Sequence, residues 1–236
     1  MKIWQEDQLS ALSNLSSEQE IFEAVKRFAS NLGFDYCAYG LRLPLAVAEP
    51  KIVMLNNYSE EWQRTYAEKN YFTVDPTVRH CMQSLKPIIW SDPLFSSARD
   101  LWEDATSFGL QHGWVQSCRD ANGSQGMLTL ARSAESISDS EMKSHYLEMF
   151  WLAQTAHIAI SKIVHDKHIP ESHAQLTKRE VEVLRWTAEG KTSYEISCIL
   201  NAAERTINFH IANSMQKLNA SNKISATVKA ALLGFL

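Results

Sequence analysis

Cysteine is scarce in this chain of 236 residues, and its four cysteines stand far apart. Cys37, Cys81, Cys118 and Cys198 include no C-x-x-C pair, which indicates neither a disulfide framework nor a thiolate zinc site. The sequence also lacks an apolar run long enough to span a bilayer, and its first residues do not have the continuous apolar stretch of a signal peptide. These absences predict a protein of the reducing cytoplasm with no membrane partner.

A surplus of positive charge is lacking as well, since the formal net charge is −4. Contacts with phosphate are local, however, so charge has to be counted by segment. From Glu171 to the end, eight Lys and Arg stand against six Asp and Glu, so this segment carries +2 and the rest of the chain −6. An excess of this size is compatible with DNA binding but is also found on ordinary solvated surfaces.

The length of the chain allows one domain of ordinary size and a small second one, each with its own core. Residues 165–175 read H-D-K-H-I-P-E-S-H-A-Q, a polar stretch with a proline and no helical or strand period, which is typical of a linker. We therefore expect one domain at residues 1–164, a linker at 165–175 and a smaller domain at 176–236.

The upstream segment mixes helical patterns with short alternating runs. This mixture predicts an α+β fold, an α-β-α sandwich in which helices cover both faces of a small sheet. Asn122-Gly123 is a strong hairpin signal, so the two strands beside it should be antiparallel. Helices are expected at residues 17–32, 60–70, 75–84, 97–108 and 138–163, and strands at residues 36–43, 51–55, 87–90, 113–119 and 126–131.

The downstream segment has an all-helical pattern with clear start signals. Thr177 and Thr192 each stand three residues before a glutamate, the spacing of a capping box, and Asn222 has the chemistry of a third helix cap. We expect four helices, the first ended by Gly190 and the third running from about residue 204 to 218. The positions expected to face the core of the first two helices are Val181, Leu184, Ala188, Ile196, Ile199 and Leu200.

A short helix, a turn and a longer amphipathic helix form the helix-turn-helix arrangement, whose longer helix enters the major groove of DNA. If Ile207, Ile211 and Met215 face the core, the opposite face of the third helix is free for base contacts. That face comprises Arg205, Thr206, Asn208, Phe209, Ala212, Asn213 and Gln216. Lys191, Thr192, Lys217 and Lys223 lie near helix ends, where phosphate contacts are expected. Periodicity alone does not distinguish this arrangement from an ordinary helical bundle with one polar face.

The particular residues of this downstream segment, beyond their helical pattern, resemble a known family. Residues 176–184, 186–192 and 204–207 resemble the DNA-binding domain of LuxR-type regulators along the whole segment. Glu180, Leu184 and Gly190 coincide with signature residues of that domain. Ala203 departs from the pattern, because relatives usually have a serine before Glu-Arg-Thr; the loss of that helix cap should cost about 1 kcal/mol without changing function.

The upstream segment carries a second resemblance. Residues 58–66, 70–71, 74–76, Trp90 and 109–113 are similar to the autoinducer-binding domain of quorum-sensing regulators. The resemblance implies a GAF/PAS-like sandwich that binds an N-acyl-homoserine lactone and needs no cofactor. It further implies a homodimer that binds a palindromic site in double-stranded promoter DNA and acts through RNA polymerase, with activation expected rather than repression.

The family pattern assigns roles around the lactone. Trp62 would donate its indole N–H to the lactone carbonyl, Asp75 would accept the amide N–H, and Tyr58 with Thr129 would hold the acyl carbonyl. The other positions expected to line the site are Tyr66, Trp90, Leu101, Trp102, Leu110, Met127, Ala38, Gly40, Gly113 and Gly126. Gln63, where others carry Arg, and Thr129, which is often Ser, leave the acyl-chain preference open.

Simpler interpretations remain beside these roles. Trp62 and Tyr66 at helical spacing are often plain core residues, and Asp75 before Pro76 is equally suited to capping a helix. A regulator of the same fold that does not respond to a lactone would have the same sequence features.

Two other classes of function are less compatible with the sequence. A cysteine-dependent hydrolase would need a base beside Cys81, but neighbouring positions on a helix point apart, so His80 cannot readily activate it. The histidines at positions 157, 165, 168 and 173 have irregular spacing and no acidic or thiol partners, so we interpret them as solvated linker histidines rather than metal ligands. The interface of the dimer is expected on the helix at 138–163 and the last helix near Leu232.

Overall fold

The computed structural model describes residues 11, 12, 14–45, 51–121 and 123–236. Its internal contacts divide the chain into two units. The first, here called the sheet unit, comprises Met1–Arg42, Lys51–Asp120 and Ser124–Ile163; the second, the helical unit, comprises Leu43–Pro50, Ala121–Gly123 and Val164–Leu236.

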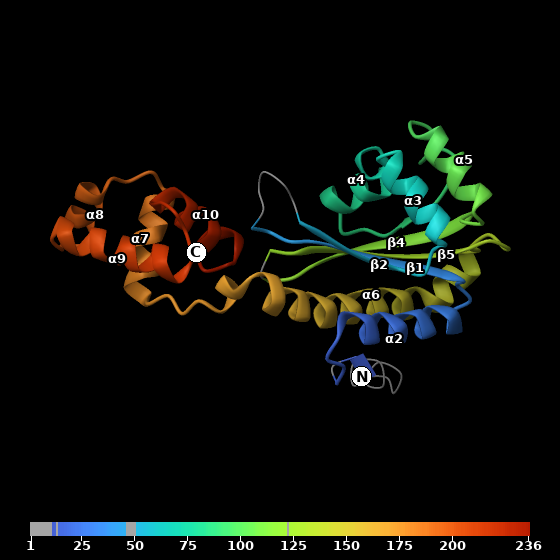
Figure 1. Cartoon of the computed structure of the whole chain (residues 1–236), viewed down its shortest axis with the longest axis horizontal. Coiled ribbons are helices and arrows are strands. Elements are labelled where there is room, and N and C mark those ends of the chain that lie inside the picture. Colours follow the sequence, from blue (N-terminus) through green and yellow to red (C-terminus); the bar gives the residue numbers. More distant parts are fainter. Residues whose placement is uncertain (1–10, 13, 46–50, 122) are drawn as a thin grey trace. The chain divides into compact units, whose positions relative to one another are not determined.

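A five-stranded sheet forms the centre of the sheet unit (Figure 1). Its strands are β1 (Tyr36–Arg42), β2 (Ile52–Asn56), β3 (Ile88–Ile89), β4 (His112–Arg119) and β5 (Gln125–Arg132). They lie in the order β2-β1-β5-β4-β3, and each neighbouring pair is antiparallel. All five strand predictions are confirmed, as is the antiparallel pairing of β4 with β5. Asn122 of the expected turn lies outside the described residues, while Gly123 has the positive φ of +79° that a turn glycine supplies.

Helices cover both faces of this sheet, which confirms the expected sandwich. In Figure 1, α2 (Glu18–Asn31) and α6 (Asp139–His168) lie together on one side of the strands. The other side carries α3 (Glu60–Glu68), α4 (Pro76–Gln83) and α5 (Arg99–Ser107), with a 3-10 turn, η1 (Tyr71–Thr73), between α3 and α4.

Strand alternation decides which residues face which layer, because successive side chains point to opposite faces. Tyr39, Leu128 and Trp114 are fully buried on the face toward α6, since the Tyr39 hydroxyl contacts His157 of α6 and the register of β1, β5 and β4 places the other two on the same face. Helix α2 contributes Ile21 and Val25 to this core, and burying a side chain of that size stabilises the fold by about 1.5–3 kcal/mol. The neighbouring strand positions face the opposite layer, which holds the cavity described below.

Helix α6 continues beyond the predicted end at residue 163, through the first residues of the expected linker. His165 and Ile169 are buried there, and the Ile169 N–H donates to the His165 carbonyl at 2.7 Å. A second 3-10 turn, η2 (Pro170–His173), follows. The prediction of a linker without helical structure is therefore wrong for residues 165–168. His157 and His165 are buried rather than solvated, because both side chains lie on the inward side of α6.

The helical unit consists of α7 (Lys178–Ala188), α8 (Ser193–Ile199), α9 (Glu204–Lys217) and α10 (Lys223–Leu232). Both predicted capping boxes are present, at Thr177 and Thr192, and Asn222 caps α10 by accepting the Ser225 N–H at 2.8 Å. The four predicted helices are confirmed. Their shared core contains Val183, Ile196, Ile207 and Ile211, and Leu184 is fully buried as well.

The inward faces of the first two helices differ in detail from the prediction. Val183 is buried while Ala188 is exposed, and Ile199 has 44% of its surface exposed. The buried face of α7 carries Glu180 together with Val183 and Leu184. The prediction counted only apolar residues, so it could not identify a buried face that includes a carboxylate. None of the described helices is both long and apolar enough to cross a membrane.

Candidate functional site

A cavity of about 310 Å³ lies in the sheet unit, with its floor on β2, β1 and β5. Its floor is made of three rows of cross-strand neighbours, each row crossing the three strands. In the order β2, β1, β5, the first row is Asn56, Ala38 and Thr129, the second is Met54, Gly40 and Met127, and the third is Ile52, Arg42 and Gln125. Small residues in β1 make room above the first two rows, since a Cβ added at Gly40 would already contact the Met127 side chain at 3.6 Å.

Aromatic side chains from outside the sheet close the cavity from the opposite side. Trp62 and Tyr66, one turn apart on α3, pack edge to face with ring centroids 5.7 Å apart, and Trp62 is only 4% exposed. Trp90 packs edge to face on Trp102 of α5 with a centroid separation of 6.2 Å. Trp62 and Tyr66 therefore pack with the core and line the cavity at the same time.

The cavity brings together thirteen of the fourteen positions predicted to line a ligand site. These are Ala38, Gly40, Tyr58, Trp62, Tyr66, Asp75, Trp90, Leu101, Trp102, Leu110, Gly126, Met127 and Thr129.

Gly113 is the exception, because it does not line the cavity. A Cβ added there would lie 2.3 Å from the Trp90 ring, so glycine at this position lets Trp90 lie against β4. Gly126 also has a different purpose from the one expected. A Cβ added at Gly126 would lie 2.4 Å from His157 Nδ1, so this glycine makes room on the α6 side of the sheet rather than for a ligand.

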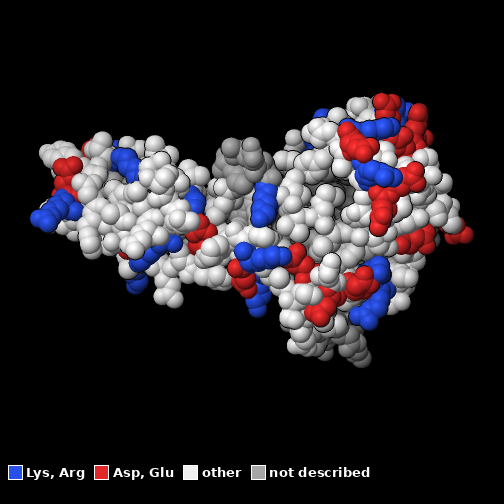
Figure 2. Space-filling model, in the orientation of Figure 1, with Lys and Arg blue, Asp and Glu red and all other residues white. Residues whose placement is uncertain are grey.

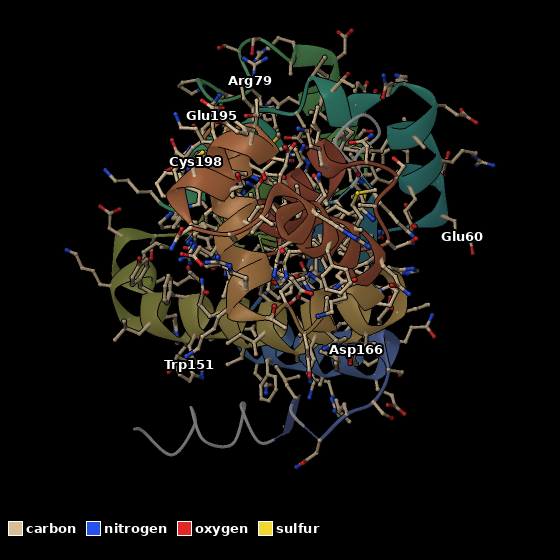
Figure 3. All side chains as sticks on the ribbon, turned by 90° about the vertical axis from the view of Figure 1, so that its left-hand side faces the viewer. Glu60, Arg79, Trp151, Asp166, Glu195 and Cys198 are labelled. Carbon is tan, nitrogen blue, oxygen red and sulfur yellow. The ribbon has the colours of Figure 1, made fainter. Side chains whose placement is uncertain are left out.

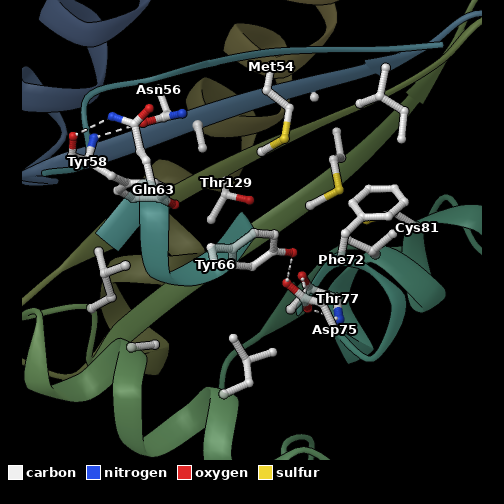
Figure 4. Close-up of a pocket in the computed structure, with 18 of the residues that line it drawn as sticks. Met54, Asn56, Tyr58, Gln63, Tyr66, Phe72, Asp75, Thr77, Cys81 and Thr129 are labelled. Carbon is white, nitrogen blue, oxygen red and sulfur yellow. Dashed lines mark hydrogen bonds between the residues drawn. The ribbon is translucent and has the colours of Figure 1, made fainter. Parts of the chain in front are cut away.

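Asp75 serves the helix and the cavity with different oxygens (Figure 4). Its Oδ1 accepts hydrogen bonds from the Thr77 backbone N–H at 2.8 Å and the Thr77 hydroxyl at 2.6 Å, which caps α4. Its Oδ2 accepts a hydrogen bond from the Tyr66 hydroxyl at 3.0 Å. Burial raises the pKa of the Asp75 carboxyl, and the hydrogen bonds from Thr77 and Tyr66 oppose that rise. Capping and a role in the cavity are therefore compatible.

Near Asp75, the Tyr58 hydroxyl, the Trp62 indole N–H and the Thr129 hydroxyl line the cavity and have no hydrogen-bond partner among the residues that the structure describes. The Trp90 indole N–H and Gln125 Oε1, which belong to other parts of the wall, have none among those residues either. Burial raises the pKa of the Tyr58 phenol, with smaller contributions from Cys37 and Asp75, so Tyr58 stays a neutral donor. An unpaired donor in such a place costs about 1–3 kcal/mol. The arrangement suits a molecule that brings acceptors to these donors and an apolar body to the rest of the wall.

Gln63, which departs from the family pattern, lines the cavity at its exposed edge. Its side-chain amide donates to the Tyr58 carbonyl at 2.8 Å, and the Tyr58 N–H donates to Asn56 Oδ1 at 3.1 Å (Figure 4). The two bonds hold the segment before α3 beside the first row of the floor.

Sequence reasoning missed a group of residues that line the same cavity. Val78, Cys81 and Met82 of α4 stand at i, i+3 and i+4, a spacing that places them on one helix face and could have been recognised. Others missed were Leu41, Arg42, Ile52, Met54, Asn56, Ala67, Phe72, Thr77, Phe95, Ala105 and Gln125. Burial raises the pKa of the Cys81 thiol to about 12, and the His80 ring contacts the Lys86 carbonyl instead, so this pair is not arranged for nucleophilic attack. In the described part of the chain, no group of three or more metal-ligating side chains gathers.

The second candidate surface is the outward face of α9 in the helical unit. Arg205, Thr206, Asn208, Ala212 and Gln216 are exposed and Asn213 is half-buried, while Ile207 and Ile211 face inward. Phe209 has 61% of its surface exposed, which is unusual for a phenylalanine that serves only the fold. Lys and Arg are interspersed with Asp and Glu on the face seen in Figure 2. On α8, Glu195 and Cys198 are exposed (Figure 3), and Glu195 belongs to the Thr192 capping box.

Lys217 occupies a different place from the other predicted phosphate contacts. Its ammonium donates to Glu180 Oε2 at 2.7 Å, to Glu180 Oε1 at 3.1 Å and to the Gln175 carbonyl at 2.9 Å. The Glu180 side chain is 3% exposed, and although burial raises its pKa, Lys217 and the Thr177 N–H hold the pKa below its usual value. Lys217 joins α9 to α7, which does not favour the predicted contact with phosphate.

Comparison with known proteins gives one matching family model for the upstream part of the chain and another for the downstream part. The model of the "Autoinducer binding domain" matches residues 17–160, and that of "Bacterial regulatory proteins, luxR family" matches residues 174–230. The transcriptional activator protein AnoR of Acinetobacter nosocomialis is 55% identical over 238 residues, covering 100% of both chains.

Two solved structures share the fold. SdiA of Escherichia coli, in a complex with octanoyl-rac-glycerol, is 33% identical with a TM-score of 0.83 and covers 98% of this chain and 95% of its own. CepR2 of Burkholderia cenocepacia, described as an N-acylhomoserine lactone dependent LuxR family factor, is 28% identical with a TM-score of 0.62. That match covers 67% of this chain and 94% of CepR2.

Proposed function

Because the chain belongs to the LuxR family of transcription regulators with an autoinducer-binding domain, we propose that an N-acyl-homoserine lactone binds in the cavity of the sheet unit and controls DNA binding by the helical unit. The protein is a regulator and not an enzyme. Residues 1–164 are proposed as the lactone-binding domain, 165–175 as the connection and 176–236 as the DNA-binding domain.

The observation that carries the ligand assignment is the set of unpartnered polar groups around Asp75. A lactone head offers two carbonyls and one amide N–H, and each would meet its complement here. The Trp62 indole donates to the lactone carbonyl, the Tyr58 and Thr129 hydroxyls donate to the acyl carbonyl, and Asp75 Oδ2 accepts the amide N–H. Each pairing removes a cost of about 1–3 kcal/mol for a buried unpaired group.

The remaining wall accepts the acyl tail. Met54, Met127, Phe72 and Val78 supply apolar surface beyond the polar group. Each methylene buried against such a wall contributes about 0.8 kcal/mol. An acylglycerol of the kind in the SdiA complex would use the same wall with hydroxyls in place of the amide, and it is the second candidate ligand.

On DNA, α9 is proposed to lie in the major groove. Asn208 and Asn213 have the chemistry for bidentate contacts with adenine, and Phe209 and Ala212 for contact with thymine methyl groups. Arg205, Thr206 and Gln216 complete the base-facing set, with Lys191, Thr192 and Lys223 on phosphates. Lys217 is left out of this interface because Glu180 holds its ammonium.

The active form is proposed to be a homodimer, since palindromic sites are bound by two-fold symmetric proteins. Leu147 and Ile158 on α6 have 61% and 59% of their surface exposed, which makes this helix the candidate interface within the sheet unit. Activation through RNA polymerase is proposed because AnoR is named an activator, although ThaA of Burkholderia thailandensis is named a repressor. The regulator acts where the DNA is, in the cytoplasm.

Substitution of the head-group residues tests the ligand assignment. Asp75→Asn keeps the size and capping ability of the side chain but removes the charge that strengthens the bond to the amide N–H. Trp62→Phe keeps an aromatic ring and removes only the indole donor. Both variants should need at least about tenfold more lactone for a half-maximal response of a promoter reporter.

The rival assignments give a different result. If Asp75 only caps α4, Asp75→Asn should leave the dose-response unchanged. If both variants track the parent protein while DNA binding is intact, the lactone site is wrong and a regulator that does not respond to lactone becomes the better interpretation.

A further inference from the structure

The floor of the cavity changes its chemistry from one end to the other. Thr129 in the first row lies with the proposed head-group residues, and the second row, of Met54, Gly40 and Met127, is apolar. Successive rows are two residues apart, or about 6.7 Å, so the third row lies about 13 Å from the first. A tail held at its carbonyl by Thr129 reaches the third row with about ten to twelve carbons.

The third row is polar where a simple tail would need an apolar surface. Arg42 of β1 and Gln125 of β5 are cross-strand partners, and both line the cavity on the same face as Gly40 and Met127. Gln125 Oε1 is shielded from solvent and accepts no hydrogen bond from any residue in the described part of the chain. The Arg42 guanidinium is half-buried and has no hydrogen-bond or ion-pair partner among the residues that the structure describes.

The neighbouring strand does not satisfy these groups. Arg119 of β4 is the cross-strand partner of Gln125 on its other side, but its guanidinium donates to the Met82 carbonyl at 2.9 Å. A methyl-terminated tail that reached the third row would lie against Gln125 Oε1 and the Arg42 guanidinium without forming a hydrogen bond to either group, which lowers affinity.

We propose that Arg42 and Gln125 form a polar end wall of the cavity, which limits the length of an unsubstituted acyl tail and binds a hydroxyl group on the last carbon of a tail that reaches it. The hydroxyl donates to Gln125 Oε1 and accepts from Arg42, so one group satisfies both side chains. The inference rests on the proposed lactone site and adds a preference within the ligand class.

Binding measurements on the full chain test the end wall with two series of N-acyl-homoserine lactones, one with plain tails of six to sixteen carbons and one with a terminal hydroxyl. For the parent protein, affinity for plain tails should rise about fourfold per carbon while the tail crosses the apolar row. It should then fall once the tail reaches the third row. At that length the terminal hydroxyl should improve affinity roughly tenfold.

Gln125→Leu replaces the unpaired amide by an apolar side chain of similar size. It should move the length optimum to longer tails and abolish the gain from the terminal hydroxyl. Gln83→Leu, the same substitution at an exposed position of α4 that does not line the cavity, is the matched control, and it should keep the length optimum and the hydroxyl gain of the parent.

Three outcomes overturn one proposal or the other. If terminal hydroxylation weakens binding to the parent at every length, the end wall is wrong, and this result does not depend on whether Gln125→Leu folds. If Gln125→Leu and the parent share one length optimum, the end wall is wrong while lactone binding stands. If no lactone of either series binds the parent, the proposed lactone site itself has failed.

Discussion

The two units of this protein treat their buried polar groups differently. In the helical unit, the buried Glu180 has its own cation, Lys217, and two capping boxes satisfy the first turns of α7 and α8. In the sheet unit, the donors of Tyr58 and Trp62 face a cavity without a partner among the described residues. The helical unit is therefore complete with its own side chains, whereas the sheet unit has the polar complement of a ligand.

The strongest way to break this comparison is to remove the internal cation of the helical unit. Lys217→Ala leaves the carboxylate of Glu180 buried and unpaired, so the free energy of unfolding of this unit should fall by about 2–4 kcal/mol. This loss of stability is smaller than for a fully buried ion pair, because the Lys217 side chain is 35% exposed and solvent screens its charge. Chemical denaturation followed by circular dichroism measures it.

Lys191→Ala is the matched control for that experiment, because it removes a lysine that forms no ion pair with a buried carboxylate among the described residues. It should change the free energy of unfolding by no more than about 0.5 kcal/mol. Equal effects of the two substitutions would mean that Lys217 is a surface lysine after all, and its predicted contact with phosphate would return.

Substitutions on the outward face of α9 should give the next largest change, in the free energy of DNA binding. Asn208→Ala should cost about 1–3 kcal/mol on the cognate site and little on random DNA, because Asn208 is proposed to read a base. Lys191→Ala should weaken both alike and reduce the salt slope by about one, as expected for a phosphate contact. Binding titrations over a range of salt concentrations measure both, and one shared pattern for the two variants would contradict the placement of α9.

The smallest expected effect is in the pH dependence of stability, to which Glu180 and Asp75 should contribute with opposite signs. The lowered pKa of Glu180 contributes stability above its unfolded value near 4.5, and that contribution is lost as pH falls through the folded value. The raised pKa of Asp75 acts in the opposite direction: its contribution is present at low pH and is lost as pH rises through the folded value.

The sign is measured as the difference between parent and variant, since Asp104 and Glu141 in the sheet unit also have lowered pKa values. Between pH 3 and 6, parent minus Lys217→Ala should gain stability with rising pH. Parent minus Asp75→Asn should lose it. The same sign in both differences would contradict the contrast between the units.

The sequence predicted those features that depend on close neighbours along the chain. Thr177, Thr192 and Asn222 cap helices through hydrogen bonds to residues three positions away. The alternation of apolar and polar residues along each strand can likewise be recognised in the sequence of that strand. The resemblance to known regulators supplied most of the cavity, because its motif lists residues that local patterns assign to a core.

The rest depends on partners far apart in the chain. Glu180 and Lys217 are 37 positions apart, and Tyr39 meets His157 across 118 positions with 2.7 Å between the hydroxyl and Nδ1. Gln125 and Arg42 become neighbours only through the register of β1 with β5. No local period signals such pairs, so the end wall of the cavity and the internal ion pair had to come from the structure.

Hydrogen exchange measured by mass spectrometry with and without a lactone tests the contrast most directly. With ligand at about a hundred times its dissociation constant, the slowest amides of β1, β5 and α4 should exchange up to about a hundredfold more slowly, equivalent to about 2.7 kcal/mol. The amides of α7, α8 and α9 should keep their rates, because that unit is complete without a ligand. Slowing of the same size in both units, or none in the sheet unit, would contradict the account.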